Sequence, residues 1–249
     1  MNKLAGRTAI VTGGAHGIGR GIAEAFANEG ADVAIADIAM NDKAAPVIEA
    51  IQQAKRKALY IRTDVAVEQQ VQSMVEEVLN AFGHIDILVN NAGIFTQALV
   101  EHLSVADWDR VLGVNLRGTF LCTHFVLPHM LAQGGGRIIN IASQLGYIGG
   151  QEVAHYSASK GGVIAFTKAL AREVATRNVL VNAIAPGPIL TDLLASETEE
   201  WKAAKLAELP IGRFGEVREV APTAVFLASD DATYYVGQTL GPNGGDVML

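Results

Sequence analysis

The chain has 249 residues, half of them hydrophobic and only 18% charged, so it can bury a sizeable core. Its formal net charge of −7 argues against a nucleic-acid-binding protein, because such a protein needs a basic face to neutralise phosphates. The single cysteine, Cys122, excludes a disulfide within the chain, and its apolar neighbours indicate a small buried hydrophobe.

Short apolar runs alternate with amphipathic segments along the chain. Six strands are predicted, over 8–14, 32–38, 58–65, 85–93, 136–143 and 178–187. Helices are predicted over 18–30, 43–55, 68–83, 105–132, 156–176 and 217–228. Because such alternation is typical of a parallel sheet covered on both faces, we expect an α/β fold with one doubly wound domain over 1–249.

Polar and glycine-rich residues follow the carboxyl ends of the predicted strands. Ligands of such sheets bind beyond these ends, so we expect the residues to converge on one crevice. They are 13–19, Asp37, Asp64, 90–93, Ser143 and 186–187.

The segment TGGAHGIG (12–19) joins the first strand to the first helix. Gly13 and Gly17 permit a tight turn and a close approach of phosphate, and Gly19 lets the helix pack near the strand. The N–H groups at the helix start favour a pyrophosphate there. The glycine spacing departs from a strict G-x-G-x-x-G, so the loop alone indicates a dinucleotide only weakly.

Asp37 ends the second strand and favours NAD over NADP. A carboxylate there accepts hydrogen bonds from the adenosine ribose hydroxyls and repels a 2′-phosphate. Ile38 stands where a phosphate-binding arginine would stand. His16 in the loop is the one feature that favours NADP, because a basic residue there can bind a 2′-phosphate. A neutral imidazole is, however, a poor substitute for arginine.

Asp64 leaves two interpretations open. It could bind the adenine amino group, with Val65 flanking the ring, or it could cap the helix that follows, since aspartate is a preferred N-cap residue. The two roles are compatible.

Six segments together resemble the compact single-domain branch of the short-chain dehydrogenase/reductase family. The resemblance covers the whole chain, with the motifs in the family's order and spacing. The segments are TGGAHGIG (12–19), NNAG (90–93), Asn115 in GVNLRG, Ser143 in NIAS, YSASK (156–160) and PGPILT (186–191).

The resemblance implies a Rossmann-type fold, a nicotinamide cofactor, and hydride transfer between C4 of the nicotinamide and a carbinol or carbonyl carbon. It implies that Asn115, Ser143, Tyr156 and Lys160 are catalytic. It also implies that residues 186–191 hold the carboxamide. With the positions above, the expected cofactor-binding residues are Gly13, His16, Gly17, Ile18, Gly19, Asp37, Ile38, Asp64, Val65, Asn91, Ala92, Gly93, Tyr156, Lys160, Pro186, Gly187, Ile189 and Thr191.

Tyr156 and Lys160 are one helical turn apart, so they share a helix face. A free tyrosine, with a pKa of about 10, is too weakly acidic to act as a base at neutral pH. Lys160 and the charge of an oxidised nicotinamide both favour the phenolate, which makes Tyr156 the expected general acid/base. Ser143 is expected to stabilise the substrate oxygen, and Asn115 to hold a water that relays protons to Lys160.

The substrate site should draw on Phe95, on 144–155 and on the segment after Pro186. The stretch 188–215 indicates a substrate lid. Gln144, Tyr147, Leu193, Leu194 and Trp201 would form a modest apolar pocket with a few polar groups, consistent with a secondary alcohol or ketone.

Two alternative functions stay open. One is an NADPH-dependent 3-oxoacyl-carrier-protein reductase, for which Arg172 is available. However, 126–136 lacks the lysine or arginine expected for docking an acidic carrier protein. The other is a catalytically silent dinucleotide-binding protein, which the intact Ser143, Tyr156 and Lys160 disfavour. We favour an NAD-linked secondary alcohol or polyol dehydrogenase.

The remaining expectations concern location and assembly. The N-terminus lacks the features of a signal peptide and no segment approaches a membrane span, so we expect a soluble cytoplasmic protein. The family resemblance implies a homotetramer, and the apolar helices 105–132 and 156–176 favour an oligomer. No ligand spacing indicates a metal. His155 is expected to be structural.

Overall fold

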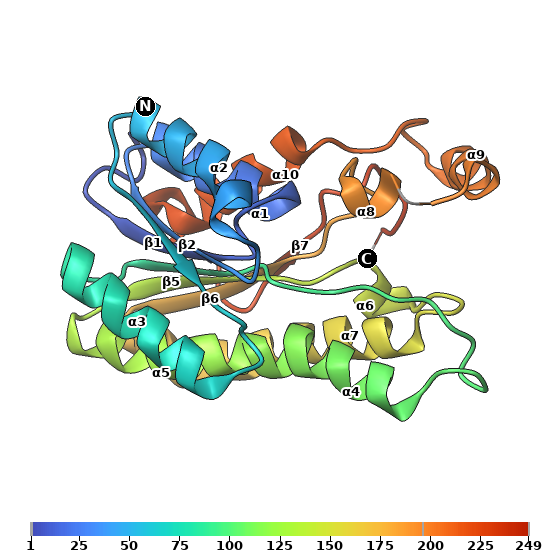
Figure 1. Cartoon of the computed structure of the whole chain (residues 1–249), viewed down its shortest axis with the longest axis horizontal. Helices are drawn as coiled ribbons and strands as arrows, with labels where there is room; N and C mark the ends of the chain where they lie inside the picture. Colours follow the sequence, from blue (N-terminus) through green and yellow to red (C-terminus); the bar gives the residue numbers. More distant parts are fainter. Residues whose placement is uncertain (1, 196, 249) are drawn as a thin grey trace.

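A seven-stranded sheet lies between two layers of helices in the computed structural model, which describes residues 2–195 and 197–248 with every side chain except that of Leu193 (Figure 1). The strands follow the order β3-β2-β1-β4-β5-β6-β7, and all six pairings are parallel. Their bounds are β1 (Thr8–Thr12), β2 (Asp32–Asp37), β3 (Ala58–Arg62), β4 (Ile87–Asn90), β5 (Gly136–Ile141), β6 (Val179–Ile184) and β7 (Thr239–Leu240). The doubly wound parallel sheet predicted from the alternation is therefore confirmed.

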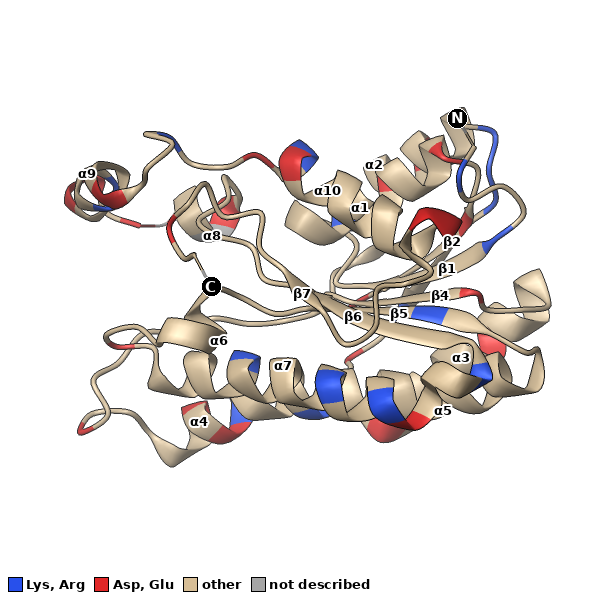
Figure 2. Cartoon of the chain, turned by 180° about the vertical axis from the view of Figure 1, so that it is seen from behind, with Lys and Arg blue, Asp and Glu red and all other residues tan. Residues whose placement is uncertain are grey.

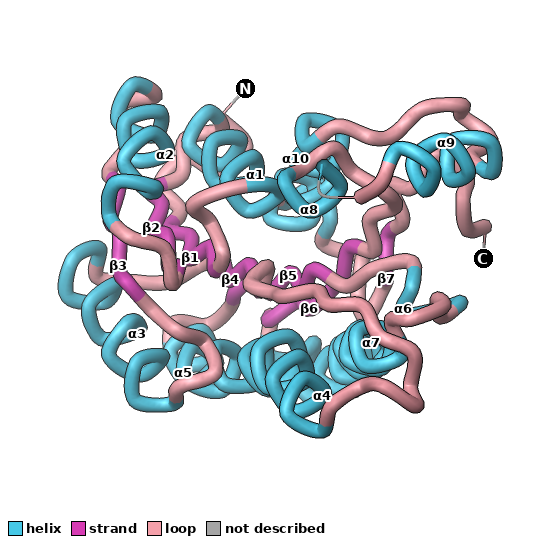
Figure 3. Tube along the Cα trace, turned by 45° about the vertical axis from the view of Figure 1, so that its right-hand side comes forward, coloured by secondary structure: helices cyan, strands magenta, loops and turns pink. Residues whose placement is uncertain are grey.

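The helices divide between the two faces of the sheet (Figure 3). One face carries α1 (Gly17–Asn28), α2 (Asn41–Gln53) and α10 (Val217–Ala228), with α8 (Asp192–Ala195) and α9 (Glu199–Glu208) beyond the strand ends. The other carries α3 (Glu68–Phe82), α4 (Val105–Leu112), α5 (Gly118–Ala132) and α7 (Ala154–Val174), with the short α6 (Leu145–Ile148) against α7. None of these helices combines the length and apolar character needed to cross a bilayer.

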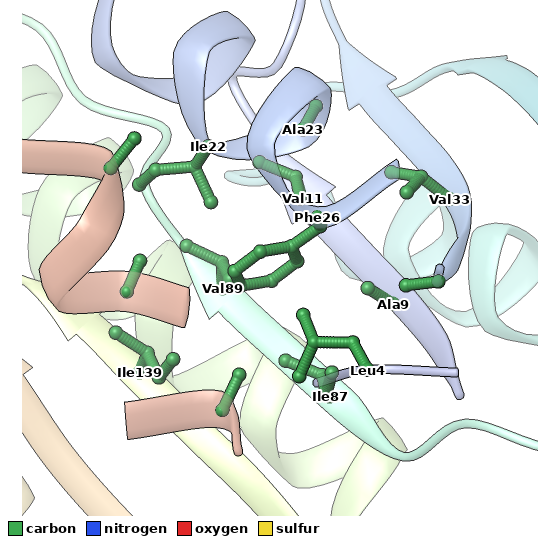
Figure 4. Packing of buried hydrophobic residues seen from close by; sticks show 14 of the residues in the cluster. Leu4, Ala9, Val11, Ile22, Ala23, Phe26, Val33, Ile87, Val89 and Ile139 are labelled. Atoms are coloured by element: carbon green, nitrogen blue, oxygen red, sulfur yellow. The ribbon is translucent and has the colours of Figure 1, made fainter. Parts of the chain in front are cut away.

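Buried side chains form one apolar cluster on each face of the sheet. On the first face, Phe26 of α1 lies among residues of β1 and β4 such as Val11 and Val89 (Figure 4). On the other face, α3, α5 and α7 pack against residues such as Ile10 and Leu88. Successive strand residues point to opposite faces, so strands covered on both sides read as continuous apolar runs.

Cys122 belongs to the second cluster and is buried, and burial raises the pKa of its thiol to about 12. Its interpretation as a small buried hydrophobe is confirmed.

The predicted helix over 105–132 is not regular. Residues Gly113–Arg117 form a π-helical turn between α4 and α5, and Asn115 lies inside it, fully buried. Hydrophobic periodicity cannot reveal one extra residue in a turn, and such turns are frequent at functional sites. The predicted strands also extend too far at their carboxyl ends, because the polar tips leave the sheet as loops.

The chain reverses direction across the sheet between β1 and β4. From β1 it continues to β2 and β3 on one side, and β4 to β7 lie on the other. The carboxyl ends of β1 and β4 therefore flank the point at which such sheets bind ligands.

Candidate functional site

The loop between β1 and α1 favours glycine at its key positions, either through its backbone conformation or through lack of space. Gly13 and Gly17 adopt left-handed backbone, with φ of +62° and +54°. A Cβ at Gly19 would lie 2.2 Å from the carbonyl oxygen of Gly13 and 2.4 Å from Nδ2 of Asn91. The predicted close packing of helix and strand at Gly19 is thus present.

We expect Gly19→Ala to lower the free energy of unfolding by about 1–3 kcal/mol, because backbone atoms must move to admit the methyl group. Gly113→Ala is the matched control: a Cβ there meets nothing within 4 Å on helical backbone, with φ of −58°. That control should be neutral or stabilising by up to about 1 kcal/mol. Urea unfolding measures both, and equal losses would contradict the steric argument.

The NNAG segment after β4 is hydrogen-bonded to the glycine loop. Nδ2 of Asn91 donates to the carbonyl oxygens of Thr12 and Gly13, at 3.0 and 2.9 Å. The backbone N–H groups of Asn91 and Ala92 both donate to Oγ1 of Thr12 at 3.0 Å. Sequence reasoning missed Thr12, whose only signal is its place directly before Gly13.

Asp37 lies at the end of β2 with its carboxylate turned toward the loop. Oδ2 accepts from the N–H of Ala15 at 2.9 Å, and Oδ1 accepts from the N–H of Ala39 at 3.0 Å. Each oxygen can accept a second hydrogen bond. The neighbouring Ile38 is 63% exposed.

Three further side chains border this end of the loop. His16 is exposed and Ile18 is half-buried, both at the start of α1. The exposed Arg62 of β3 donates from Nε to the carbonyl oxygen of Ile38 at 3.4 Å, which places a cation beside Asp37. Sequence reasoning missed Arg62 because its position depends on the pairing of β2 with β3.

Asp64 does not cap the following helix. Its Oδ1 accepts from the N–H of Ala66 at 2.9 Å and closes a turn, while α3 begins four residues later with Val67 as its N-cap residue. The capping interpretation is therefore wrong. Val65 is buried, and a Cβ at Gly118 would lie 2.7 Å from its Cγ2, so Val65 packs against the start of α5.

Tyr156 and Lys160 lie in the first two turns of α7, where the sequence places them. Lys160 is buried; its Nζ donates to the carbonyl oxygen of Ile141 at 2.7 Å and lies 5.7 Å from the centroid of the Tyr156 ring. Burial disfavours the ammonium and lowers the pKa of Lys160 to about 8.

Burial raises the pKa of Tyr156, and a hydrogen bond with Ser143 opposes this rise. In the chain by itself burial outweighs the hydrogen bond with Ser143, and the help that the sequence led us to expect from Lys160 is not among the causes that shift the pKa of Tyr156. The Ser143 hydroxyl also accepts from the N–H of Leu145 at 3.2 Å, which orients it at the end of β5.

Asn115 joins the π-helical turn to the loop after β4 and to α7. Its Oδ1 accepts from the N–H of Ile94 at 2.8 Å, and its Nδ2 donates to the carbonyl oxygen of Ile94 at 3.0 Å and to Oγ of Ser159 at 3.1 Å. A Cβ on Gly93 would lie 3.3 Å from Oδ1 of Asn115 and 3.5 Å from Nζ of Lys160. Gly93 therefore lies between the amide and the ammonium.

The PGPILT segment after β6 returns to the glycine loop. A Cβ on Gly17 would come within 3.6 Å of the Thr191 methyl group. Ile189 is buried and pairs with Gly215, while the N–H of Gly187 donates to the carbonyl oxygen of Pro242 at 3.2 Å. Pro186 accepts from the N–H of Gln144 at 3.2 Å. The structure thus places the PGPILT segment beside the glycine loop and beside the residue that follows Ser143.

Gln144, the residue after Ser143, is tied to the C-terminal tail and to the predicted lid. Its Nε2 donates to Asp246, which is also paired with Lys205 of α9 at 2.8 Å. A cavity of about 280 Å³ opens beside Gln144, Tyr147, Thr239 and Asn243. Tyr156 and Ser143 do not line this cavity.

The other residues predicted for the substrate side differ in exposure. Phe95 and Tyr147 are half-buried, Leu194 is buried and Trp201 is 37% exposed. The side chain of Leu193, and Ser196 within the predicted lid, lie outside the description. Among the described residues, no group of three or more histidine, cysteine, aspartate or glutamate side chains is arranged to hold a metal ion.

The chain is similar to known proteins over nearly its whole length. A family model described as enoyl-(acyl carrier protein) reductase matches residues 13–246. The 3-oxoacyl-[acyl-carrier-protein] reductase of Staphylococcus epidermidis is 43% identical over 248 residues, covering 100% of both chains. That of Aquifex aeolicus is 44% identical over 243 residues, covering 98% of both.

Two solved structures are also similar over nearly their whole length. A provisionally assigned short-chain alcohol dehydrogenase from Sinorhizobium meliloti 1021 is 36% identical, with a TM-score of 0.95 and 98% of both chains covered. Levodione reductase is 33% identical, with a TM-score of 0.93 and 97% of both chains covered.

Proposed function

Because the chain belongs to the short-chain dehydrogenase/reductase family, whose members interconvert alcohols and carbonyl compounds, we propose that it is an NAD(H)-dependent oxidoreductase acting on a secondary alcohol or ketone. One observation carries the proposal. Tyr156, Lys160 and Ser143 gather at the end of β5, and Gly93 connects them to the glycine loop. A dinucleotide suits this loop, since the side chain of His16, the N-cap residue of α1, makes no cap hydrogen bond and leaves the N–H groups at the helix start for a pyrophosphate.

In the proposed reaction, Tyr156, Ser143 and Lys160 handle the proton and the charge on the substrate oxygen. When bound, the nicotinamide accepts or supplies the hydride. During oxidation the Tyr156 phenolate takes the proton of the alcohol hydroxyl as the alcohol becomes a ketone, and during reduction the phenol returns it. Ser143 donates to the same substrate oxygen and stabilises its developing charge. Protonated Lys160 favours the phenolate and can donate to the ribose hydroxyls.

Asn115 has a positioning role and a proposed relay role. Its amide holds Ile94 and Ser159, which keeps the loop after β4 against α7. We propose that it also binds a water that carries protons to Lys160, since its amide and the Lys160 ammonium both lie close to Gly93.

The remaining cofactor residues are assigned by position. Asn91, Ala92 and Gly93 line the adenosine side, and Pro186, Gly187, Ile189 and Thr191 hold the carboxamide. His16, Ile18, Ile38, Asp64 and Val65 border the pyrophosphate and adenine.

Asp37 supports NAD over NADP, because a carboxylate at the end of β2, beside the glycine loop, would repel a 2′-phosphate. Charges a few Å apart at an effective dielectric constant of ~20 interact by a few kcal/mol, so we expect Asp37→Asn to shift the kcat/KM ratio about 10- to 100-fold toward NADP(H). Parallel assays at 340 nm with both cofactors measure the ratio. Asp32→Asn, at the opposite end of β2, is the control and should leave it unchanged. An unchanged ratio in Asp37→Asn would remove the basis for the NAD assignment.

An NADPH-dependent 3-oxoacyl-carrier-protein reductase is the second candidate, favoured by the names of the relatives and by Arg62 beside Ile38. Lys168 and Arg172 are exposed on α7, and Figure 2 shows basic positions spaced along this helix. The end of α5, however, carries His129 and no lysine or arginine.

One experiment separates the two candidates. A panel of secondary alcohols, polyols and ketones, together with 3-oxoacyl-carrier protein, is assayed at 340 nm with NAD(H) and NADP(H). Turnover of small substrates with NAD(H) supports the first proposal. NADPH preference with a salt-sensitive KM for the carrier protein would establish the second instead.

We also propose that 188–215 closes over the substrate as a lid. The support is the place of α8 and α9 beyond the strand ends, as Figure 3 shows, and the exposure of several bonds that hold this part of the chain. Gln97 reaches Glu197 at 3.3 Å and Arg213 pairs with Glu219 at 2.6 Å, both at the surface, whereas the start of the segment is anchored by the buried Ile189. Surface-held segments beside a site are the ones that close over substrates.

A homotetramer is our proposal for the assembly. Trp108 of α4 and Phe120 of α5 are 37% and 47% exposed, and α5 is apolar around its circumference. Met248 in the tail is also exposed, whereas Leu249 lies outside the description. Exposed apolar surface of this kind marks protein interfaces, and light scattering of the purified protein measures the state.

A further inference from the structure

The irregular segment 94–98, which follows the NNAG motif, is held at three points. The side-chain amide of Asn115 accepts a hydrogen bond from the N–H of Ile94 and donates one to its carbonyl oxygen. The N–H of Ala98 donates to the carbonyl oxygen of Glu152 at 2.8 Å. Between these, Oγ1 of Thr96 lies 2.7 Å from Nε2 of His155. Two of the three anchors therefore come from the start of α7 and from the loop just before it.

His155 is an unusual anchor for a loop. Its side chain has no exposed area, and its Nδ1 has no hydrogen-bond partner among the described residues. The Thr96 hydroxyl can donate or accept, so it complements Nε2 in either neutral tautomer of the ring. A buried polar group with a single partner strongly favours the geometry that keeps this partner.

Phe95 lies directly between two of the anchors and contacts the proposed general acid/base. Its ring meets the ring of Tyr156 edge to face, with centroids 5.0 Å apart and an interplanar angle of 78°. This is a preferred arrangement of aromatic pairs. Tyr156 follows His155 in the chain, so the Thr96–His155 bond and the Phe95–Tyr156 contact form two adjacent links between the segment and α7.

We propose that Thr96 and His155 are positioning residues, which hold Phe95 against Tyr156 and so set the orientation of the phenol toward the substrate. This proposal rests on the function proposed above. It assigns the buried histidine a part in the reaction geometry, in addition to the structural role expected from the sequence. Neither residue is required to exchange a proton.

Thr96→Val tests the hydrogen bond, because valine keeps the shape of threonine and removes the hydroxyl. We expect kcat to fall roughly 10-fold, since small misplacements of a reacting group are costly, with the KM for NAD(H) unchanged. Thr96→Ser keeps the hydroxyl and should retain most of the activity. Equal kcat values for wild type and Thr96→Val would overturn the proposal, as would an equal loss in Thr96→Ser. If Thr96→Val does not fold, Thr96→Ala is measured in its place.

A double-variant cycle tests the route through Phe95. If Thr96 acts by holding Phe95, adding Thr96→Val to Phe95→Ala should cause little further loss, because residues acting through one another are non-additive. A full, independent 10-fold loss in the Phe95→Ala background would show that Thr96 does not act through Phe95.

A spectroscopic readout keeps this test separate from the proposed activity. The chain has five tyrosines, so the Tyr156 signal in protein labelled with ¹³C at tyrosine Cζ can be assigned by its absence in Tyr156→Phe. We expect this signal to shift or broaden in Thr96→Val and to stay in place in Thr96→Ser. Absence of turnover in the wild type would refute the function alone, whereas an unmoved Tyr156 signal in Thr96→Val would refute the positioning role.

Discussion

Tyr156→Phe is expected to lower kcat about 10²- to 10⁴-fold in both reaction directions, the usual contribution of a general acid/base. The substitution removes only the phenolic oxygen. The ring that meets Phe95 edge to face remains, so the packing at the start of α7 should be kept. Steady-state rates at 340 nm, with NAD(H) binding followed by nicotinamide fluorescence, measure the effect. Cofactor binding should stay within about threefold, because the hydroxyl acts on the substrate oxygen.

Tyr235→Phe is the matched control for this prediction. Tyr235 packs its ring against Phe226 of α10, with centroids 4.9 Å apart, on the face of the sheet opposite α7. Its substitution should leave kcat within about twofold. A Tyr156→Phe protein that keeps more than a tenth of the wild-type kcat would show that another group handles the proton.

Lys160→Met is expected to act through the pH dependence of the reaction. Below its pKa of about 8, Lys160 is protonated, and in the proposed reaction we expect its charge to favour the phenolate of Tyr156. Without this charge, the apparent pKa in the kcat/KM profile for alcohol oxidation should rise by about one to three units. Each unit is a tenfold change in phenolate population, so kcat/KM at pH 7 should fall about 10- to 1000-fold.

The sign of this shift differs between the two reaction directions. Oxidation needs the phenolate and accelerates as pH rises, whereas reduction needs the phenol and is fastest at low pH. Raising the apparent pKa therefore penalises oxidation near neutrality more than reduction. Profiles of kcat/KM between about pH 6 and 10, recorded for oxidation and for reduction, measure the shift in each direction.

Lys168→Met provides the control on the same helix. Lys168 lies two turns beyond Lys160 and is exposed, so its charge is screened by solvent. We expect its profiles to coincide with those of the wild type. If Lys160→Met also left the oxidation limb in place, Lys160 would serve cofactor binding alone, and its effect would appear in the KM for NAD.

Local patterns determined much of the site. Near-continuous apolar runs separated by amphipathic segments require a sheet covered on both faces, and polar tips on parallel strands must meet at one edge. The glycines of the loop were also predictable: a Cβ at Gly13 or Gly19 would overlap neighbouring atoms, and Gly17 adopts left-handed backbone that other residues rarely take. The one-turn spacing of Tyr156 and Lys160 likewise follows from helix geometry alone.

Other features of the site depend on tertiary packing and could not be predicted from local sequence patterns. The π-helical turn around Asn115 adds one residue to a helix without breaking its apolar face, so periodicity does not reveal it. The bond of Thr96 to His155 joins residues 59 positions apart, and that of Gln144 to Asp246 joins residues 102 apart. The turn closed by Asp64, in place of a helix cap, depends on where the loop leaves β3.

The same distinction applies to the titratable groups of the site, whose identity and whose pKa values have different origins. The sequence by itself determined which groups stand together: a phenol, an ammonium and a hydroxyl at the end of β5. Only the tertiary structure decided how acidic they are, because burial raises the pKa of Tyr156 and lowers that of Lys160 to about 8. Residue type and spacing set the possible chemistry, whereas desolvation, which depends on every neighbouring element, sets the pH at which it operates.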